Sequence, residues 1–359
     1  MNSQVSRRAL VALTLFCISV ILGCQNNGNN SSTGNGTAAD RSPIHVGVIA
    51  DSTGFMTPHG QGNEMGARIA AEHLNASGGI LGHPVELHIL DGASDPSTTA
   101  ERTRELIQRH SISLLIGTTS SATTLAAIPP VTEAKVPFIY SLDGECKTCS
   151  PGASDTVSPY VWGSGFTERM VVEPLLTYMH ARSGKPANEF SVYFMGGDYV
   201  YPRTTNGFAK EVATSLGFTV VGDTYSDTST QDYSPDIRKI IDASPDLLIV
   251  TNPGESGVRF MKQAQTFGLS DSVMISGFAT FDQEMIIQMG QASEGVYCIN
   301  RYSKSLDNPE NARFLRSYED MYPDEKLLPG PTAAAGTYGS LMVAAQAILR
   351  EHLPELRVR

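Results

Sequence analysis

The chain has 359 residues, of which 41% are hydrophobic, so it is long enough for two lobes with cores of their own. Its formal net charge of −11 argues against nucleic acid as a partner, which needs a basic surface, and against peripheral binding to anionic lipid. After the first 24 residues, no segment is long and apolar enough to cross a bilayer.

The first 24 residues have the organisation of an export signal. Arg7 and Arg8 precede an uncharged apolar run over residues 9–22, which is shorter than the roughly 20 apolar residues of a membrane span. The run ends in ILGC, residues 21–24, which resembles the lipobox of bacterial lipoproteins. The resemblance implies that residues 1–23 are a signal peptide and that Cys24 is lipidated. An ordinary secretory signal is the alternative, and removal of residues 1–23, with two arginines and no acid, would take the charge from −11 to −13.

Residues 24–42 are expected to form a flexible tether. Their sequence after the cysteine, QNNGNNSSTGNGTAADR, has no apolar periodicity and cannot bury enough surface to offset its ordering entropy. A chain of this composition spans roughly 20–25 Å root-mean-square. A tether of this kind would hold a folded domain off a membrane surface.

Three further cysteines lie in the remaining chain. Cys146 and Cys149 stand in GECKTCS, where a redox C-x-x-C motif should open a helix and a zinc site needs a second ligand pair. We therefore predict a disulfide within a loop, which an export compartment permits. Cys298 lies in the strand-like EGVYCIN and is expected to be a buried thiol.

Strands and helices alternate along the rest of the sequence. Strands are expected at 44–50, 84–91, 112–117, 137–141, 190–196, 218–224, 246–250, 272–277 and 295–300. Helices are expected at 62–76, 96–110, 121–134, 168–182, 204–216, 234–243, 255–267, 309–321 and 332–350, with a short one before the last strand. The alternation predicts an α/β fold of two Rossmann-like lobes with parallel sheets. We expect lobe 1 at 43–164 plus 302–359 and lobe 2 at 165–301.

The sequence contains none of the motifs of common enzyme classes. GVIADSTG does not match the dinucleotide fingerprint, and neither a phosphate-binding P-loop nor a nucleophile elbow is present. His59, expected in a loop, and the other histidines lack the spacing of a metal site. We therefore predict no enzyme activity, no cofactor and no metal site.

Two segments place hydrogen-bonding side chains after expected strands, where open α/β sheets bind ligands. In GTTSSATT, residues 117–124, Ser120 and Ser121 begin a helix, and their hydroxyls and amides suit a carboxylate or amide oxygen. Helix capping by these serines is the alternative. In FMGGDYVYPRTTN, residues 194–206, Tyr199 and Tyr201 could stack on an apolar ligand and donate hydroxyls, or one could pack into the core.

These segments also carry a family resemblance, from about residue 44 to 350. GDYVYPRTTN, residues 197–206, resembles the motif of the urea and short-chain amide binders among the type I periplasmic solute-binding proteins of the leucine/isoleucine/valine kind. NASGGILGHPVELHILD, residues 75–91, is similar to a helix–turn–strand of that family. The resemblance implies two lobes joined by three crossovers that close on a small solute and deliver it to an ABC permease.

On the matching positions, the resemblance implies a set of ligand contacts. Ser121 would donate to a ligand carboxylate or amide, and Tyr140 would form a wall. Tyr199 and Tyr201 would face the ligand from the second lobe. The remaining members of the expected ligand-binding set are Ser120, Ser141, Asn252 and Phe278.

The sequence departs from the family in three places. Amino-acid binders have an acid after the strand 272–277, whereas this chain has GFAT, which disfavours a typical α-amino acid. Candidate replacement acids are Asp143, Glu145, Glu255 and Asp282. Leu142 stands where the amide binders have threonine. The family continues past the last helix into a further strand pair, so this chain is expected to lack the last strands and the third crossover.

The combined interpretation is an extracytoplasmic solute-binding lipoprotein of an ABC uptake system. It would lie in the periplasm or at the cell surface, anchored by lipid to a bacterial membrane, and bind a small amide, urea-like or amino-acid-type solute. A ligand-sensing receptor or regulator of the same fold is the first alternative, which the export signal disfavours. An exported redox protein that uses Cys146 and Cys149 is the second.

Overall fold

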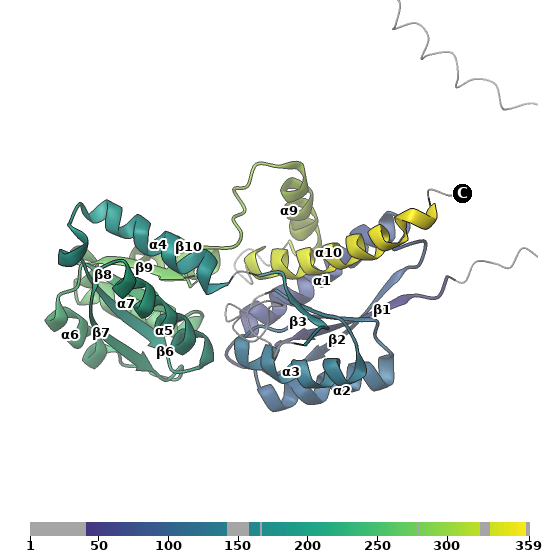
Figure 1. Cartoon of the computed structure of the whole chain (residues 1–359), viewed down its shortest axis with the longest axis horizontal. Helices are drawn as coiled ribbons and strands as arrows, with labels where there is room; N and C mark the ends of the chain where they lie inside the picture. Colours follow the sequence, from purple (N-terminus) through teal and green to yellow (C-terminus); the bar gives the residue numbers. More distant parts are fainter. Residues whose placement is uncertain (1–40, 142–157, 166, 279, 324–330, 357–359) are drawn as a thin grey trace, which may run out of the picture. The chain divides into compact units, whose positions relative to one another are not determined.

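The computed structural model describes residues 41–141, 158–165, 167–278, 280–323 and 331–356. Their strands form two five-stranded sheets, with the orders β2-β1-β3-β4-β5 and β10-β9-β8-β6-β7 (Figure 1). Every neighbouring pair of strands is parallel. The predicted fold class, two α/β lobes with parallel sheets, is confirmed.

The first lobe consists of the first sheet and the helices that pack on it. Its strands are β1 (Ile44–Ala50), β2 (Val85–Asp91), β3 (Leu114–Gly117), β4 (Phe138–Tyr140) and β5 (Val161–Gly163). Its helices are α1 (Thr57–Ala76), α2 (Pro96–His110), α3 (Ser121–Ala134) and α10 (Pro331–Leu356). Between β10 and α10 in the sequence, α9 (Pro309–Met321) contacts α1 and α10.

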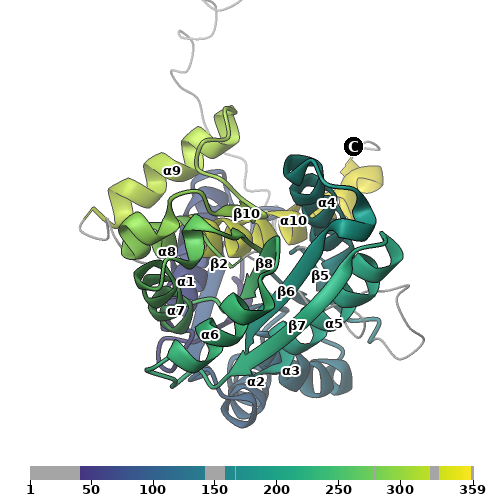
Figure 2. The ribbon, with the colours of Figure 1, turned by 90° about the vertical axis from the view of Figure 1, so that its left-hand side faces the viewer.

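The second lobe consists of the second sheet and five helices. Its strands are β6 (Ser191–Gly197), β7 (Thr219–Ser226), β8 (Leu247–Thr251), β9 (Met274–Phe278) and β10 (Tyr297–Ile299). Its helices are α4 (Glu168–Ser183), α5 (Val200–Ser215), α6 (Ser234–Ala243), α7 (Glu255–Thr266) and α8 (Gln283–Met289). Figure 2 shows α4 and α5 on one face of this sheet and α6 and α7 on the other.

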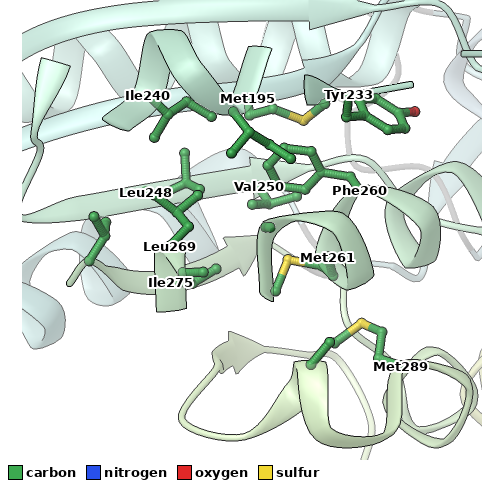
Figure 3. Close-up of a cluster of buried hydrophobic side chains, with 14 of the residues drawn as sticks. Met195, Tyr233, Ile240, Leu248, Val250, Phe260, Met261, Leu269, Ile275 and Met289 are labelled. Atoms are coloured by element: carbon green, nitrogen blue, oxygen red, sulfur yellow. The ribbon is translucent and has the colours of Figure 1, made fainter. Parts of the chain in front are cut away.

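Each sheet is covered on both faces, as parallel sheets require. In the first sheet, alternate residues of β1 enter different cores: Val46 and Val48 pack with α1 and α10, and Ile49 packs with α2 and α3. In the second lobe, Leu248 and Val250 of β8 pack against α6, α7 and α8, the cluster drawn in Figure 3.

The last helix returns to the first lobe through a close helix crossing. A Cβ at Gly66 of α1 would overlap the carbonyl of Ala334 in α10, and one at Gly62 would lie 2.5 Å from the Cβ of Ala333. Only glycine permits this approach. The crossing places Thr337 of α10 inside the first lobe, beside the ends of β3 and β4.

Several boundaries differ from the predicted ones. Helix α1 begins at Thr57 with Pro58 in its first turn, so His59 lies in a helix and not in a loop. Helix α5 begins at Val200, earlier than the predicted residue 204. The short strand β5 was not predicted because three residues give no periodicity. Cys298 lies in β10 but is half-buried, not fully buried.

Several predictions fall outside the described residues. They are the signal peptide of residues 1–23, lipidation at Cys24, the tether up to residue 40, and the Cys146–Cys149 disulfide. Leu142, Asp143 and Glu145 lie outside as well. Among the helices that the structure describes, none combines the length and hydropathy that a membrane crossing requires.

Candidate functional site

Polar groups gather where the strands of each sheet have their carboxyl ends, which we call the carboxyl edge of that sheet. In the first lobe, β3 ends in a tight turn: Gly117 has φ +108° and Thr118 has φ +64°. A Cβ at Gly117 would overlap the carbonyl of Ile49 in the neighbouring strand. The turn therefore needs glycine, and it directs the chain from β3 into the start of α3.

Ser120 and Ser121 form the start of α3. Ser120 is the N-cap: its Oγ accepts a hydrogen bond from Thr123 N at 3.2 Å, and Thr123 Oγ1 accepts one from Ser120 N, which completes a capping box. The Ser120 hydroxyl therefore caps the helix, as the alternative interpretation of these serines predicts. Ser121 is the first helical residue, and its side chain is buried.

A buried hydrogen-bond chain joins this turn to β4. Asn63 Nδ2 donates to Thr118 O at 2.8 Å, and Asn63 Oδ1 accepts from the hydroxyl of Thr337 at 2.7 Å. Because that hydroxyl has only one hydrogen, Ser141 must donate in its 3.1 Å contact with Thr337 Oγ1. Ser141 follows Tyr140, whose ring lies over Gly163 of β5. The chain links α1, α10 and the ends of β3 and β4.

Asp51, directly after β1, is a buried carboxylate at the same edge. It accepts hydrogen bonds from the hydroxyl of Thr119 and from Ser94 N, the latter at 3.0 Å. Burial raises the pKa of the Asp51 carboxyl above its usual value, although these two hydrogen bonds oppose the shift. The carboxylate fixes the segments after β1, β2 and β3 to one another.

At the carboxyl edge of the second sheet, Tyr199 and Asn252 lie together. A Cβ at Gly197 would lie 2.5 Å from the Tyr199 ring and 3.1 Å from Asn252 Oδ1, so the absence of a side chain there lets both approach. Asn252 is fully buried, and its Oδ1 accepts from Ser256 Oγ at 2.8 Å. Tyr199 is half-buried and is the N-cap residue of α5.

Tyr201 and Phe278 also lie together, but inside the second lobe. The hydroxyl of Tyr201 donates to the carbonyl of Phe278, and both side chains belong to the core cluster between the sheet and α4 and α5. Burial raises the pKa of the Tyr199 and Tyr201 hydroxyls, so both remain protonated donors at neutral pH. The structure thus places Tyr199 beside Asn252 and places Tyr201 in the core.

Residues of the two lobes meet at the start of α1. The Phe55 ring contacts the Tyr199 ring edge-on, and His59 Nε2 lies 3.5 Å from Asp282 Oδ2. The other ring nitrogen of His59, Nδ1, is buried and has no hydrogen-bond partner among the described residues. Helices α3 and α5, which begin at Ser121 and Val200, also contact each other. Ser121 and Tyr199 are therefore at the starts of two helices that contact each other.

Sequence reasoning missed Phe55, His59, Asp51 and Asn63. Asp51 and Phe55 had a usable signal, since they follow the first predicted strand at its carboxyl end. Asn63 and His59 had none, because their roles depend on partners far along the chain, Thr118 and Asp282. Of the candidate replacement acids, Asp282 lies at this contact between the lobes, whereas Glu255 is 81% exposed and lies 3.6 Å from Arg259.

A separate hollow of about 730 Å³ lies at the crossover after β10. Its lining includes Ile286, Arg301, Tyr302 and Lys304 and none of the predicted site residues. The carboxyl edges of the two sheets, where the fold gathers polar groups, remain the better candidate for ligand binding.

Residues 43–351 match the family model of the periplasmic binding proteins. The chain belongs to this family. It is 24% identical over 304 residues to Leu/Ile/Val-binding protein homolog 6 of Brucella melitensis biotype 1, which covers 83% of this chain and 74% of that protein. It is 24% identical over 238 residues to homolog 8 of Brucella abortus (strain 2308), which covers 65% of this chain. The chain spans 58% of the length of homolog 8, less than two thirds.

Solved structures of similar fold include three solute-binding proteins. An ABC transporter substrate-binding protein from Sphaerobacter thermophilus has a TM-score of 0.74 and 26% identity over 86% of this periplasmic binding protein and 81% of that chain. A solute-binding protein from R. palustris in complex with 4-hydroxybenzoate has a TM-score of 0.75 and 22% identity. The match covers 86% of this chain and 80% of that chain. A branched-chain amino acid transporter substrate-binding protein from Streptococcus pneumoniae in complex with isoleucine has a TM-score of 0.72 and 23% identity. The match covers 85% of this chain and 84% of that chain. The predicted family and the type I architecture are confirmed.

Proposed function

We propose that this protein is the extracytoplasmic solute-binding component of an ABC uptake system and that it binds a small solute between its lobes by hinge closure, without chemistry. The observation that carries the proposal is that polar residues lie at both carboxyl edges, on helices α3 and α5, which contact each other. Ser121 begins a helix in one lobe, and Tyr199 and Asn252 lie at the facing edge of the other. Hinge closure around a ligand is the usual motion of two such lobes.

The chemistry of the edges suits a ligand with an acceptor oxygen and an apolar part. The start of α3 offers a hydroxyl and helix amides to a carboxylate or amide oxygen. The half-buried ring of Tyr199 offers an apolar face, and the buried His59 Nδ1 offers a further polar atom. The ligands named for two of the similar structures, isoleucine and 4-hydroxybenzoate, both carry a carboxylate. We therefore propose a small carboxylate-bearing or amide solute with an apolar part, and keep a urea-like solute, which has the acceptor oxygen alone, as a further candidate.

A variant at Asp282 can show whether the solute is an amino acid or lacks an ammonium group. Asp282 caps α8 by accepting from Met285 N at 3.1 Å and lies at the contact with His59. In this proposal a ligand ammonium pairs with the Asp282 carboxylate beside His59. Asp282→Asn should then weaken the binding of an amino acid at least about tenfold and leave a ligand that lacks an ammonium unaffected, because only the former loses a charge-assisted bond.

A thermal-shift panel tests the proposal. The full-length protein is melted with urea, short amides, branched-chain amino acids and small carboxylates including 4-hydroxybenzoate. A ligand at about 100 times its dissociation constant stabilises the folded state by about 2.7 kcal/mol, which raises the melting temperature by several degrees. If no solute raises the melting temperature and titration calorimetry detects no binding, the proposed function is wrong.

The cellular setting is part of the same proposal. We place the protein in the periplasm or at the cell surface, anchored to a bacterial membrane through lipid on Cys24, where it would deliver solute to an ABC permease. Stable anchoring requires two membrane signals, such as two acyl chains. A pull-down from detergent-solubilised membranes tests this part of the proposal. We expect the wild-type protein to retain a permease when its solute is present.

A further inference from the structure

Three potential metal ligands cluster at the amino-terminal ends of β1 and β2, away from the carboxyl edge. His45 Nδ1 lies 2.9 Å from His88 Nε2. Glu86 reaches both rings, with one carboxylate oxygen 3.8 Å from His45 Nδ1 and the other 3.6 Å from His88 Nε2. One ligand atom from each residue can be chosen so that all three lie within 4.8 Å of one another.

The register of the first sheet produces this cluster. His45 stands opposite Glu86, and Gly47 stands opposite His88, in a parallel pair. Paired residues of parallel strands, and residues two apart, share one face of the sheet, so all three side chains lie on the same side.

The imidazole of His88 is held in place before any ligand binds. The His110 ring, at the end of α2, stacks on it with centroids 4.4 Å apart and planes at 28°. The side chain of His88 is 16% exposed, whereas those of His45 and Glu86 are 33% and 52% exposed. A cation can therefore reach the cluster from solvent and find one ligand already ordered.

We propose that His45, Glu86 and His88 form a binding site for a divalent transition-metal ion such as Zn²⁺, with water at the fourth position. Neighbouring ligands of a tetrahedral zinc ion, with bonds of about 2.0–2.1 Å, lie about 3.3 Å apart. The two nitrogens lie 2.9 Å apart, and the separations of 3.6 and 3.8 Å run from them to different oxygens of Glu86. One ligand atom from each residue lies within 4.8 Å of the other two, so rotation of the Glu86 carboxylate brings three atoms onto one ion. Glu86 supplies one negative charge against the two positive charges of the ion.

The ligand types fix the class of metal. Two imidazoles and one carboxylate suit zinc, copper and nickel, whereas magnesium and calcium prefer sites made of oxygen ligands. In the absence of metal the two rings are joined by a hydrogen bond, in which one nitrogen carries the proton. For a metal ion to take the place of that proton, the proton moves to the other nitrogen of the same ring, and both facing nitrogens then offer lone pairs. Local spacing in the sequence does not indicate this site, because His45 lies 43 residues before His88.

Titration calorimetry of the full-length protein, without a polyhistidine tag, tests the proposal with ZnCl₂ alone. We expect one zinc ion per chain and no binding of Mg²⁺ or Ca²⁺. His45→Gln and Glu86→Gln should each weaken zinc binding at least about tenfold, because each removes one of three ligands. Both positions are partly exposed, so the variants should fold, and unchanged circular dichroism checks this.

Two controls make the result specific to the cluster. His83→Gln removes a half-buried histidine of the same lobe, whose Nδ1 lies 2.9 Å from Ser42 O, and should leave zinc affinity unchanged. A variant with Cys146 and Cys149 both replaced by serine should also bind as the wild type does. If the wild type does not bind zinc, or if the glutamine variants at His45 and Glu86 bind it unchanged, the proposal is overturned. The site does not depend on the proposed function, since Ser121→Ala should leave zinc binding intact.

Discussion

The rings of Phe55 and Tyr199 meet edge-on, with centroids 5.7 Å apart and planes at 64°. Phe55 lies after β1 in the first lobe, and Tyr199 is the N-cap residue of α5 in the second, so the contact joins the elements that would enclose a solute. An aromatic pair of this geometry contributes about 0.5–1.5 kcal/mol beyond its buried area.

Phe55→Ala should weaken solute binding roughly two- to tenfold, because the closed state loses this aromatic contact. Titration calorimetry with a solute identified in the thermal-shift panel measures the change. Phe267→Ala removes a comparably exposed phenylalanine at the end of α7 and serves as the control. Equal affinities for the Phe55→Ala variant and the wild type would show that the contact does not contribute to closure.

Ser121→Ala should weaken the binding of a carboxylate-bearing solute about ten- to hundredfold. The variant loses a hydrogen bond to a charged group, which contributes about 1.5–3 kcal/mol. Ser113→Ala, at an exposed serine before β3, is the matched control and should bind normally. If both variants bind alike, Ser121 does not contact the solute.

Thr337→Val should destabilise the folded protein by about 1–3 kcal/mol. The substitution keeps the side-chain volume but leaves the buried Asn63 Oδ1 without its donor and Ser141 without its acceptor. Urea unfolding measures the loss. Thr214→Val, at an exposed position of α5, removes only a bond to Lys210 O and should change stability far less. Equal losses in the two variants would contradict a structural role for the buried chain.

The raised pKa of Asp51 predicts a pH-dependent stability. Because the folded state keeps this carboxyl protonated to higher pH than the unfolded state does, its contribution is fully present below the usual pKa of 3.8 and is lost as pH rises through the folded-state value. Asp51→Asn mimics the neutral form, so its stability relative to the wild type should increase as pH rises from about 4. Urea unfolding at several pH values would contradict this if the difference between the two proteins stayed constant.

Lipidation at Cys24 is directly measurable on protein from bacterial membranes. Mass spectrometry of the N-terminal peptide should show that residues 1–23 are absent and that Cys24 carries fatty acyl groups. Cys24→Ser should abolish the acylation. A mature N-terminus elsewhere, or an unmodified Cys24 thiol in the wild type, would favour the ordinary secretory signal.

Much of the fold could be predicted because the relevant signals are local. The buried strands 114–117 and 247–251 are uninterrupted apolar runs, and Asp95 followed by Pro96 marks the start of α2, where the Asp95 side chain accepts from Thr98 N. The start of α1 was predicted too late because residues 57–62 contain two glycines and a proline and have no helical periodicity. There, packing against the end of β1 decides the structure: a Cβ at Gly60 would overlap the backbone of Asp51.

The candidate site was only partly predictable for the same reason. Ser121 and Tyr199 each lie within four residues of the end of a strand, so their position at a carboxyl edge could be inferred. Whether Tyr199 or Tyr201 enters the core depends on which residue begins α5, and a shift of two residues turns a helical side chain to the opposite face. The pairing of His45 with His88 depends on strand register, which local sequence does not reveal.

The central claim is that one small solute binds between Ser121 of the first lobe and Tyr199 of the second. Titration calorimetry with a solute found in the thermal-shift panel tests this claim most directly. The proteins compared are the wild type, the double variant Ser121→Ala/Tyr199→Ala and the control double variant Ser113→Ala/Tyr178→Ala. We predict one solute per wild-type chain, unchanged affinity in the control, and at least a hundredfold loss in the first double variant. Wild-type affinity in the Ser121→Ala/Tyr199→Ala variant would contradict the account.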